Sequence, residues 1–298
     1  PDQVVVTHGS QQALELLTRV LVDPGAEIAL ADPAYVGAVQ AFRLAGATLV
    51  GIPSDRDGMR VDVLAERIAA GARPVLVYVV AEFDNPTGAT LAPDRRRALA
   101  DLANRCGFVI VEDDPYGELR WAGVRTPGLA TMSDRVVTLG TVSKILAPGL
   151  RVGWAVAPGE LAAALVRVKQ AADLQTATLT QHIAHRVLAE PGFLEPHLAS
   201  LRTRYEAQAR SLAAALRVEL GDRITFDEPA GGMFLWARLA DVDTRALLPA
   251  AVAAGTAFVP GAEFAVDDVR PDSLRLSFAT AAPAQLAEAA HRLARAIG

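Results

Sequence analysis

The feature of this sequence that most restricts its fold is a regular alternation of short apolar runs with longer amphipathic segments. The runs are rich in valine and isoleucine and have the length of strands, whereas the segments between them repeat apolar residues at helical spacing. Strands that are apolar on both faces are typical of a mostly parallel sheet covered by helices on both sides, so an α/β fold is predicted. The predicted strands span residues 4–7, 28–31, 48–52, 75–80, 109–111, 136–139 and 152–156, and the predicted helices span residues 11–22, 34–45, 61–70 and 93–106.

The pattern changes after about residue 191. One long helix is predicted over residues 195–220, and short strands follow it that have a more antiparallel character. This indicates a large domain over residues 1–194 and a smaller C-terminal α+β domain over residues 195–298, bridged by the long helix. The later strands are predicted at residues 224–226, 233–237, 257–259 and 274–278, and the helices at residues 244–254 and 283–297.

Composition narrows the range of partners and compartments. A formal charge of −5 and a pI near 5.6 argue against non-specific nucleic-acid binding, and no apolar run approaches the roughly 18 residues that a membrane span needs. The single cysteine, Cys106, cannot form an internal disulfide, which favours a reducing, cytoplasmic location. Its place at an apolar helix end predicts a buried thiol.

One polar stretch, residues 138–154, interrupts the apolar pattern and contains Lys144. Small hydroxyl residues, Thr141 and Ser143, come just before this lysine, and Arg151 follows one loop later. Such a lysine can form a Schiff base beside a bound phosphate. Taken alone, Lys144 is better explained by a solvated surface position, so the other strand ends decide the question.

Polar groups follow several other predicted strands, and the carboxyl ends of strands form the binding crevice of an open α/β sheet. Ser10 and Gln11 open a helix whose free N–H groups suit a phosphate, although an ordinary helix capped by Ser10 is the simpler alternative. Tyr35 could stack on a planar ring or belong to the core. Asn85, in the stiff turn Asn85-Pro-Thr-Gly88, can offer its amide to a ligand oxygen.

Carboxylates and a buried arginine complete the set. Asp113 lies in the run Glu112-Asp-Asp-Pro-Tyr116, where buried carboxylates need cations or donors. A pyridinium nitrogen would supply such a cation for Asp113. A divalent metal is the competing explanation, but no histidine or cysteine lies nearby at metal-ligand spacing. Arg275, inside an apolar strand, requires a carboxylate from either a substrate or the protein. Together these groups match what a phosphorylated pyridine aldehyde requires.

Seven motifs extend the match over essentially the whole chain. The sequence resembles the class I/II, fold-type I aminotransferases that use pyridoxal 5′-phosphate, and within them the 2-aminoadipate aminotransferase-like branch. The motifs are Gly9-Ser-Gln-Gln-Ala-Leu14, Asp32-Pro-Ala-Tyr35, Asn85-Pro-Thr-Gly88, Glu112-Asp-Asp-Pro-Tyr116, Ser143-Lys144 with Pro148-Gly-Leu-Arg-Val-Gly153, Gly231-Gly-Met-Phe-Leu-Trp236 and Leu274-Arg-Leu-Ser277.

The resemblance implies a role for each candidate residue. Lys144 would form the internal aldimine and move the proton between the substrate Cα and the cofactor. Asp113 would pair with the pyridine nitrogen, Asn85 and Tyr116 would bond the 3′-oxygen, and Tyr35 would stack on the ring. Arg275, with Asn85, would bind the substrate carboxylate. The phosphate would be held by Ser10, Gln11, Thr141, Ser143 and Arg151.

The resemblance also implies a homodimer that moves the amino group of an L-amino acid to a 2-oxo acid, with 2-oxoglutarate as the acceptor. The identity of the donor stays open. The chain departs from its relatives at residues 81–84, where they usually have a proline and a glutamine. It also begins directly in a strand pattern, so the family's N-terminal region is expected to lie outside this chain because of truncation or disorder.

Two other interpretations stay open. Transcription regulators of the GntR/MocR type fuse a DNA-binding domain to an aminotransferase-like domain that serves as a sensor, although the motifs at residues 85–88 and 231–236 look enzyme-like. A different pyridoxal phosphate reaction at Cα, such as β-elimination or decarboxylation, would use the same lysine, because side-chain geometry selects the bond that breaks.

Overall fold

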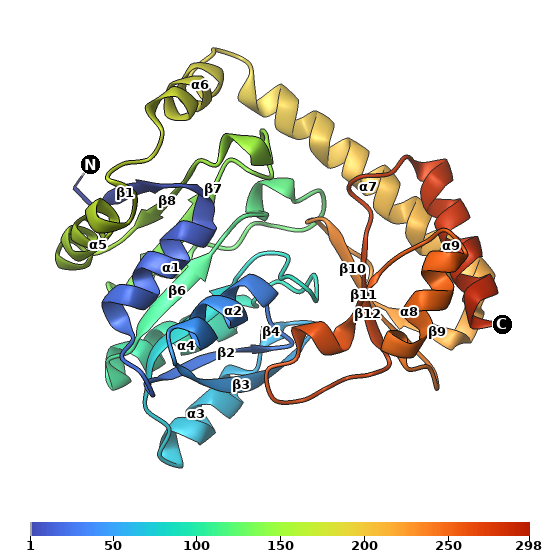
Figure 1. Ribbon diagram of the computed structural model, residues 1–298, viewed down its shortest axis with the longest axis horizontal. Helices are drawn as coiled ribbons and strands as arrows, with labels where there is room; N and C mark the ends of the chain where they lie inside the picture. The colour runs from blue at the N-terminus through green and yellow to red at the C-terminus, as the bar shows by residue number, and fades with distance from the viewer. Residues whose placement is uncertain (1) are drawn as a thin grey trace.

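The larger part of the molecule is a mixed sheet of eight strands in the order β1-β8-β7-β6-β5-β2-β3-β4 (Figure 1). The computed structural model describes residues 2–298. β3, β2, β5, β6 and β7 run parallel, whereas β1, β8 and β4 form antiparallel pairs at the two edges. The predicted mostly parallel sheet is therefore confirmed. The strands are β1 (Val4–Thr7), β2 (Glu27–Asp32), β3 (Thr48–Asp55), β4 (Gly58–Met59), β5 (Pro74–Val80), β6 (Val109–Asp113), β7 (Val136–Thr141) and β8 (Gly153–Val156).

Helices cover both faces of this sheet, because the central strands are apolar at every position. In β5, Leu76 and Tyr78 face the core under α1 (Gly9–Leu21), α2 (Val36–Leu44) and α5 (Gly159–Asp173), while Val77 and Val79 face α3 (Val61–Ala69) and α4 (Pro93–Cys106). Each fully buried side chain of this size stabilises the fold by roughly 1.5–3 kcal/mol relative to exposure. Two separate apolar cores therefore hold the sheet from either side.

A second, antiparallel sheet in the order β11-β12-β10-β9 lies beside the first (Figure 1). The helix α7 (Leu194–Leu220) runs from one sheet to the other. Tyr205, near its middle, packs against the core under α1, α2 and α5 and also against the core of the second sheet. The C-terminal half of α7 lies in the core of the second sheet. A division at residue 195 stays a proposal. The elements here are β9 (Ile224–Phe226), β10 (Phe234–Leu239), β11 (Val259–Pro260), β12 (Ser273–Ser277), α8 (Thr244–Ala253) and α9 (Pro283–Ile297).

A buried carboxylate connects the two parts at the end of β2. Asp32 is 3% exposed and accepts hydrogen bonds from the backbone N–H groups of residues 266, 267 and 268, at 3.1, 2.9 and 2.9 Å. Next to it, the Ala34 N–H donates to the carbonyl of Phe264 at 2.8 Å. Hydrogen bonds to an ionised acceptor are the stronger kind. The segment that leads into Tyr35 is thereby fixed to the loop before β12.

Two local predictions were wrong. Helix α1 begins at Gly9, so Ser10 lies in its first turn and is not the cap; Gln12 reaches back and accepts from the His8 N–H at 2.8 Å. Cys106 is exposed, because it is the last residue of α4, beyond the positions that α4 buries.

Two helices were not predicted at all. These are α5, between β8 and the linker at residues 174–177, and α6 (Thr178–Leu188). Among the residues of α6, only Ala184 is buried, so its apolar pattern gives no core-facing stripe. Short 3₁₀ helices are also present at Gly117–Leu119, Leu129–Thr131, Pro148–Leu150, Gly221–Arg223 and Gly261–Phe264. Over residues 2–298, no helix has both the length and the apolar character needed to cross a membrane.

Candidate active site

A cavity of about 180 Å³ lies at the carboxyl ends of β5, β6 and β7, beside the first turn of α1. Tyr78, Val80, Pro115, Pro148 and Phe234 contribute to its wall. The structure thus brings together residues that lie far apart in the sequence, from Ser10 to Arg151. The predicted cofactor residues that line it are Ser10, Gln11, Tyr35, Asn85, Asp113, Tyr116, Thr141, Ser143, Lys144 and Arg151.

Lys144 follows β7 and lies in a positively charged environment. Burial, together with the charges of Arg151 and Arg275, lowers the pKa of its ammonium, while Asp113 acts in the opposite direction. A lowered pKa raises the fraction of neutral amine, which is the form that attacks an aldehyde or accepts a proton. The lowered pKa therefore favours the neutral amine of Lys144.

Asp113 ends β6 and has one carboxylate oxygen without a protein partner. Its Oδ2 accepts a hydrogen bond from the Tyr78 hydroxyl at 2.9 Å, whereas its buried Oδ1 has none among the described residues. Burial raises the pKa of Asp113 to about 7. The unsatisfied oxygen fits a ligand that brings a cationic N–H donor.

Tyr78 was missed by the sequence reasoning. The available signal was a hydroxyl in the middle of an otherwise apolar strand, two residues before the carboxyl end of β5. Burial, followed by the nearby Asp113, raises the pKa of the Tyr78 hydroxyl, so this group stays protonated and can only donate to a carboxylate.

The two other carboxylates of the motif at residues 112–116, Glu112 and Asp114, bind protein partners instead. Glu112 accepts from Arg96 at 3.3 Å and from the Leu129 N–H at 3.0 Å. Asp114 accepts from the Gly117 N–H at 2.8 Å and pairs with Arg125 at 3.1 Å. In the part of the chain that is described, no group of three or more His, Cys, Asp or Glu side chains could hold a metal ion.

Three of the five predicted phosphate donors, Thr141, Ser143 and Arg151, form one cluster. The Thr141 hydroxyl lies 2.9 Å from the Ser143 hydroxyl, and the Arg151 guanidinium lies 3.4 Å from the latter. Arg151 also donates to the His8 carbonyl at 3.1 Å, directly before the start of α1. Hydroxyls, a guanidinium and a helix N-terminus together form an environment that favours a dianion.

Tyr35 and Tyr116 form separate parts of the wall. The Tyr35 hydroxyl donates to Gln11 at 3.1 Å, and the Gln11 amide donates to the Gly37 carbonyl at 2.9 Å. Tyr116 is buried, which raises the pKa of its hydroxyl, and it packs edge-on against Phe234. Both rings are thus fixed by protein contacts. Stacking by Tyr35 stays a prediction.

Arg275 reaches Asn85 from β12. Its Nη1 donates to the Asn85 side-chain oxygen at 2.7 Å, and its guanidinium lies 4.2 Å from the Phe234 ring centre. Its Nε is buried without a partner, and no ion pair to a protein carboxylate is formed by it within residues 2–298. The Asn85 amide nitrogen remains free to donate. Phe234, which sequence reasoning placed only within a motif, supports the guanidinium.

Residues 81–84, where the chain departs from the family pattern, are held by contacts within the protein. Glu82 is buried and pairs with Arg96 at 2.6 Å and with Arg120. Arg120 also covers the Phe83 ring at 4.5 Å. These contacts fix the segment that leads into Asn85.

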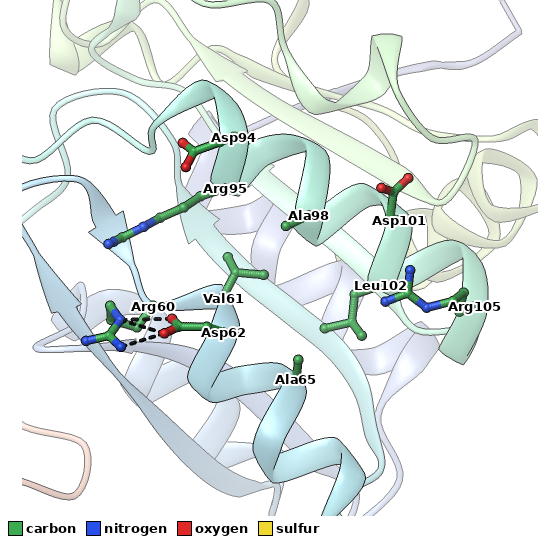
Figure 2. A pocket seen from close by; sticks show the side chains of 10 residues that line it. All are labelled: Arg60, Val61, Asp62, Ala65, Asp94, Arg95, Ala98, Asp101, Leu102 and Arg105. Carbon is green, nitrogen blue, oxygen red and sulfur yellow. Dashed lines mark hydrogen bonds and ion pairs between the residues drawn. The ribbon is translucent and has the colours of Figure 1, made fainter.

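Larger hollows lie elsewhere. One of about 490 Å³ is a surface groove between α3 and α4, where Figure 2 shows Arg60 paired with Asp62 beside an apolar floor. Another, of about 450 Å³, lies between the two sheets and shares Phe234 with the cavity. None of the predicted site residues lines the groove between α3 and α4. The smaller cavity, with its unpartnered polar atoms, is therefore the candidate site.

Comparison with known proteins agrees with this geometry. The family model for "Aminotransferase class I and II" matches residues 1–293. This chain belongs to the class I and II aminotransferases. It is 40% identical over 302 residues to aromatic-amino-acid aminotransferase 1 of Thermococcus litoralis, covering 99% of this chain and 72% of that protein. The aminotransferase is accordingly an enzyme that transfers amino groups.

Solved structures give the same assignment. The crystal structure of LysN, an alpha-aminoadipate aminotransferase from Thermus thermophilus, superposes with a TM-score of 0.94 at 38% identity, covering 100% of this chain and 77% of that one. It contains N-(5′-phosphopyridoxyl)-L-leucine. The aminotransferase described here has the same fold, fold type I, and its cofactor is pyridoxal phosphate.

One match concerns a regulator. The aminotransferase is 34% identical over 249 residues to the probable rhizopine catabolism regulatory protein MocR of Rhizobium meliloti. The match covers 83% of this chain but 48% of that protein.

The residues present fit pyridoxal phosphate. The unpartnered Asp113 Oδ1 belongs to a cavity that otherwise offers donors: the Lys144 amine, the free Asn85 amide and the Tyr116 hydroxyl. The cluster of Thr141, Ser143 and Arg151 lies in the same cavity wall. One anionic group and one phosphate-binding cluster in the same cavity match the two ends of the cofactor.

Proposed function

We propose that the aminotransferase moves the amino group of an L-amino acid to a 2-oxo acid, with 2-oxoglutarate as acceptor, using a covalent link between Lys144 and the cofactor. The observation that carries this proposal is the position of Lys144 in a cavity whose buried acid, Asp113, has one carboxylate oxygen without a donor. When bound, the cofactor supplies an electron sink for the pair left on the substrate Cα.

Proton transfer, cofactor binding and substrate binding are assigned to residues of the chain. With the cofactor bound, Lys144, whose ammonium pKa is lowered, would accept the proton released at the substrate Cα. Asp113 would hold the ring nitrogen through its negative charge. Asn85 and Tyr116 would hold the ring oxygen, and Arg275 would bind the substrate carboxylate.

A panel of amino donors tests the proposal. Full-length protein loaded with pyridoxal phosphate is mixed with 2-oxoglutarate and one of several amino acids: aromatic ones, leucine or 2-aminoadipate. We expect glutamate and the donor's keto acid to appear in equal amounts. The panel reflects the relatives, which are named for aromatic and aminoadipate donors. Release of ammonia or carbon dioxide instead would indicate β-elimination or decarboxylation.

A regulator's sensor domain is the second candidate, favoured by the similarity to MocR. Such a domain would bind the cofactor and an amino acid without turnover. Spectral changes upon adding an amino acid, with no glutamate formed from any donor, would support it over the enzyme.

A homodimer is also proposed, on the basis of exposed apolar residues around α6. Leu174, Leu179 and Ile183 are 79%, 71% and 42% exposed, which is unusual for large apolar side chains clustered on one segment. Sedimentation of the protein over a range of concentrations would measure its assembly state.

Arg275→Ala should raise KM for amino donors by roughly 10- to 100-fold, because a charge-assisted contact to a carboxylate is lost. Affinity for pyridoxal phosphate should change little, and Arg275→Lys should be intermediate because lysine cannot form the two-pronged contact. Steady-state kinetics and cofactor titration measure the two quantities.

Arg238→Ala is the matched control, since Arg238 lies on the neighbouring strand β10 and pairs with Asp272 at the surface. It should leave KM unchanged. Equal losses of donor and cofactor affinity in Arg275→Ala would show that the arginine is structural.

A further inference from the structure

Behind the first turn of α1, a side-chain cluster that the proposed mechanism does not use connects α1 to α5. The His8 Nδ1 lies 2.9 Å from Asp173 Oδ2, and the Gln12 amide donates to the same oxygen at 2.7 Å. Lys169, 6% exposed, lies 2.6 and 2.7 Å from the two oxygens of Asp173. Asp173 is therefore the common acceptor of three donors.

The contacts define the tautomer of His8. A carboxylate only accepts, so Nδ1 carries the hydrogen. Nε2 accepts from the backbone N–H of Ala177 at 3.3 Å and therefore carries none. The His8 ring joins α1 on one side to the linker between α5 and α6 on the other. Within that linker, the Thr176 hydroxyl donates to the Val6 carbonyl at 3.0 Å, which fastens it to β1 as well.

The backbone at His8 and Gly9 is held from the opposite side by Arg151. The guanidinium donates to the His8 carbonyl at 3.1 Å, and a Cβ on Gly9 would clash with it. Gly9 also has φ +75°, a left-handed conformation that glycine adopts freely. The turn that presents the N–H groups of α1 is thus held by two contacts. Arg151, inside the cavity, binds its backbone, and the His8–Asp173 hydrogen bond holds it from outside the cavity.

Charge balance explains why a lysine belongs to the cluster. An isolated aspartate near a helix N-terminus would offset the positive end of the helix dipole. Lys169 offsets the charge of Asp173 through contacts to both of its oxygens. The free N–H groups of α1 therefore keep their positive potential for an anion.

We propose that His8 and Asp173 are positioning residues for the cofactor phosphate: their hydrogen bond orients the first turn of α1 so that its N–H groups, together with Arg151, meet the phosphate. This inference rests on the proposed site. Neither residue lines the cavity, so the effect is transmitted through the His8 backbone.

Comparing pyridoxal phosphate with pyridoxal isolates the phosphate. Both ligands carry the same aldehyde. Pyridoxal also cyclises to a hemiacetal in solution and pyridoxal phosphate cannot, but this difference is the same for every variant, so a change in the ratio of the two dissociation constants between variants reports phosphate binding. In His8→Ala, we expect affinity for pyridoxal phosphate to fall about tenfold, the equivalent of one charged hydrogen bond, while affinity for pyridoxal is unchanged. Titration of the apoprotein followed by absorbance measures both.

Two amide variants distinguish loss of the His8–Asp173 hydrogen bond from a folding defect. In His8→Asn, the side-chain NH₂ takes the place of Nδ1–H and should restore the ratio; His8→Gln reaches the position of Nε2 instead and should not. His291→Ala, which removes an exposed histidine 3.2 Å from Glu219, is the matched control and should leave both affinities unchanged.

The outcomes separate the two proposals. Parallel loss of both affinities, equal behaviour of His8→Asn and His8→Gln, or no loss at all would overturn the positioning role. Glutamate formation by the wild-type protein is measured separately. Its failure would count against the proposed function, whereas a normal rate with an unchanged ratio in His8→Ala would count against this inference only.

Discussion

Replacing Lys144 with alanine should lower the rate of transamination by roughly 10²- to 10⁴-fold or more, because one amine both holds the cofactor and moves the proton. Visible absorbance from the covalent link should disappear, although phosphate contacts at the cluster of Thr141, Ser143 and Arg151 should still retain some cofactor. Stopped-flow absorbance and keto-acid analysis measure the two effects. An unchanged spectrum in Lys144→Ala would refute the assignment.

The composition of the chain makes this test unusually clean. It contains two lysines, Lys144 and Lys169. Lys169 is buried and bound to both oxygens of Asp173, so its amine is not accessible to an aldehyde. Reducing the loaded protein with borohydride should fix the cofactor to one site, and peptide mass mapping should find it on Lys144. Label on Lys169 would contradict the placement of the active site.

Replacing Asp113 with asparagine should lower kcat by roughly 10²- to 10³-fold, the usual cost of removing one preorganised electrostatic group. Asparagine keeps a partner for the Tyr78 hydroxyl but has no charge to hold a proton on the ring nitrogen. The absorption spectrum of the bound cofactor should change accordingly. Asp114→Asn, in the next residue, is the control and should have a small effect, because Asp114 pairs with Arg125 and Gly117 outside the cavity.

The same substitution should change how the stability of the apoprotein depends on pH. Burial raises the pKa of Asp113 in the folded state to about 7 from an ordinary value of 3.8. As pH rises between these values, the unfolded chain loses this proton before the folded chain does. Ionisation of Asp113 therefore costs stability, with the penalty absent below pH about 4 and complete above pH about 7.

Urea denaturation of the apoprotein measures this penalty. The gain in the free energy of unfolding of Asp113→Asn over wild type should be near zero at pH about 4 and rise to roughly 2–4 kcal/mol by pH about 8. Glu112 and Asp84, whose pKa values burial raises to about 7 and about 6, act in the same direction in both proteins and cancel in the difference. A gain independent of pH would contradict a raised pKa.

The sheet and its site were predictable because both follow from local patterns. Continuous apolar strands specify a buried parallel sheet, and polar residues at strand ends converge on one edge whatever the tertiary details. Asp113 and Lys144 were predicted in this way, from positions directly after β-branched runs, and both line the same cavity. Arg275 was found as a charge inside an apolar strand, although its partner Asn85 could not be inferred from either segment alone.

The rest depended on contacts between distant segments. Tyr78 looks like a core residue until β6 brings Asp113 beside it. The cap of α1 is completed by Gln12 and not by Ser10, which side-chain preferences would not distinguish. Helix α6 buries only Ala184 fully, so periodicity gives no signal for it. Cys106 follows the pattern of a buried helix face but lies past the positions that α4 buries.

The carboxylate of Asp32 has a consequence for how this sequence can vary. Its three donors are main-chain amides, which every residue except proline supplies. The side chain at position 268 can therefore vary without loosening the joint, while Asp32 cannot. Asp267 adds a second link, because its carboxylate accepts a hydrogen bond from the Gly51 N–H of β3 at 2.8 Å. A chimera that takes its first half from one homologue and its last third from another should therefore keep the acids at both position 32 and position 267.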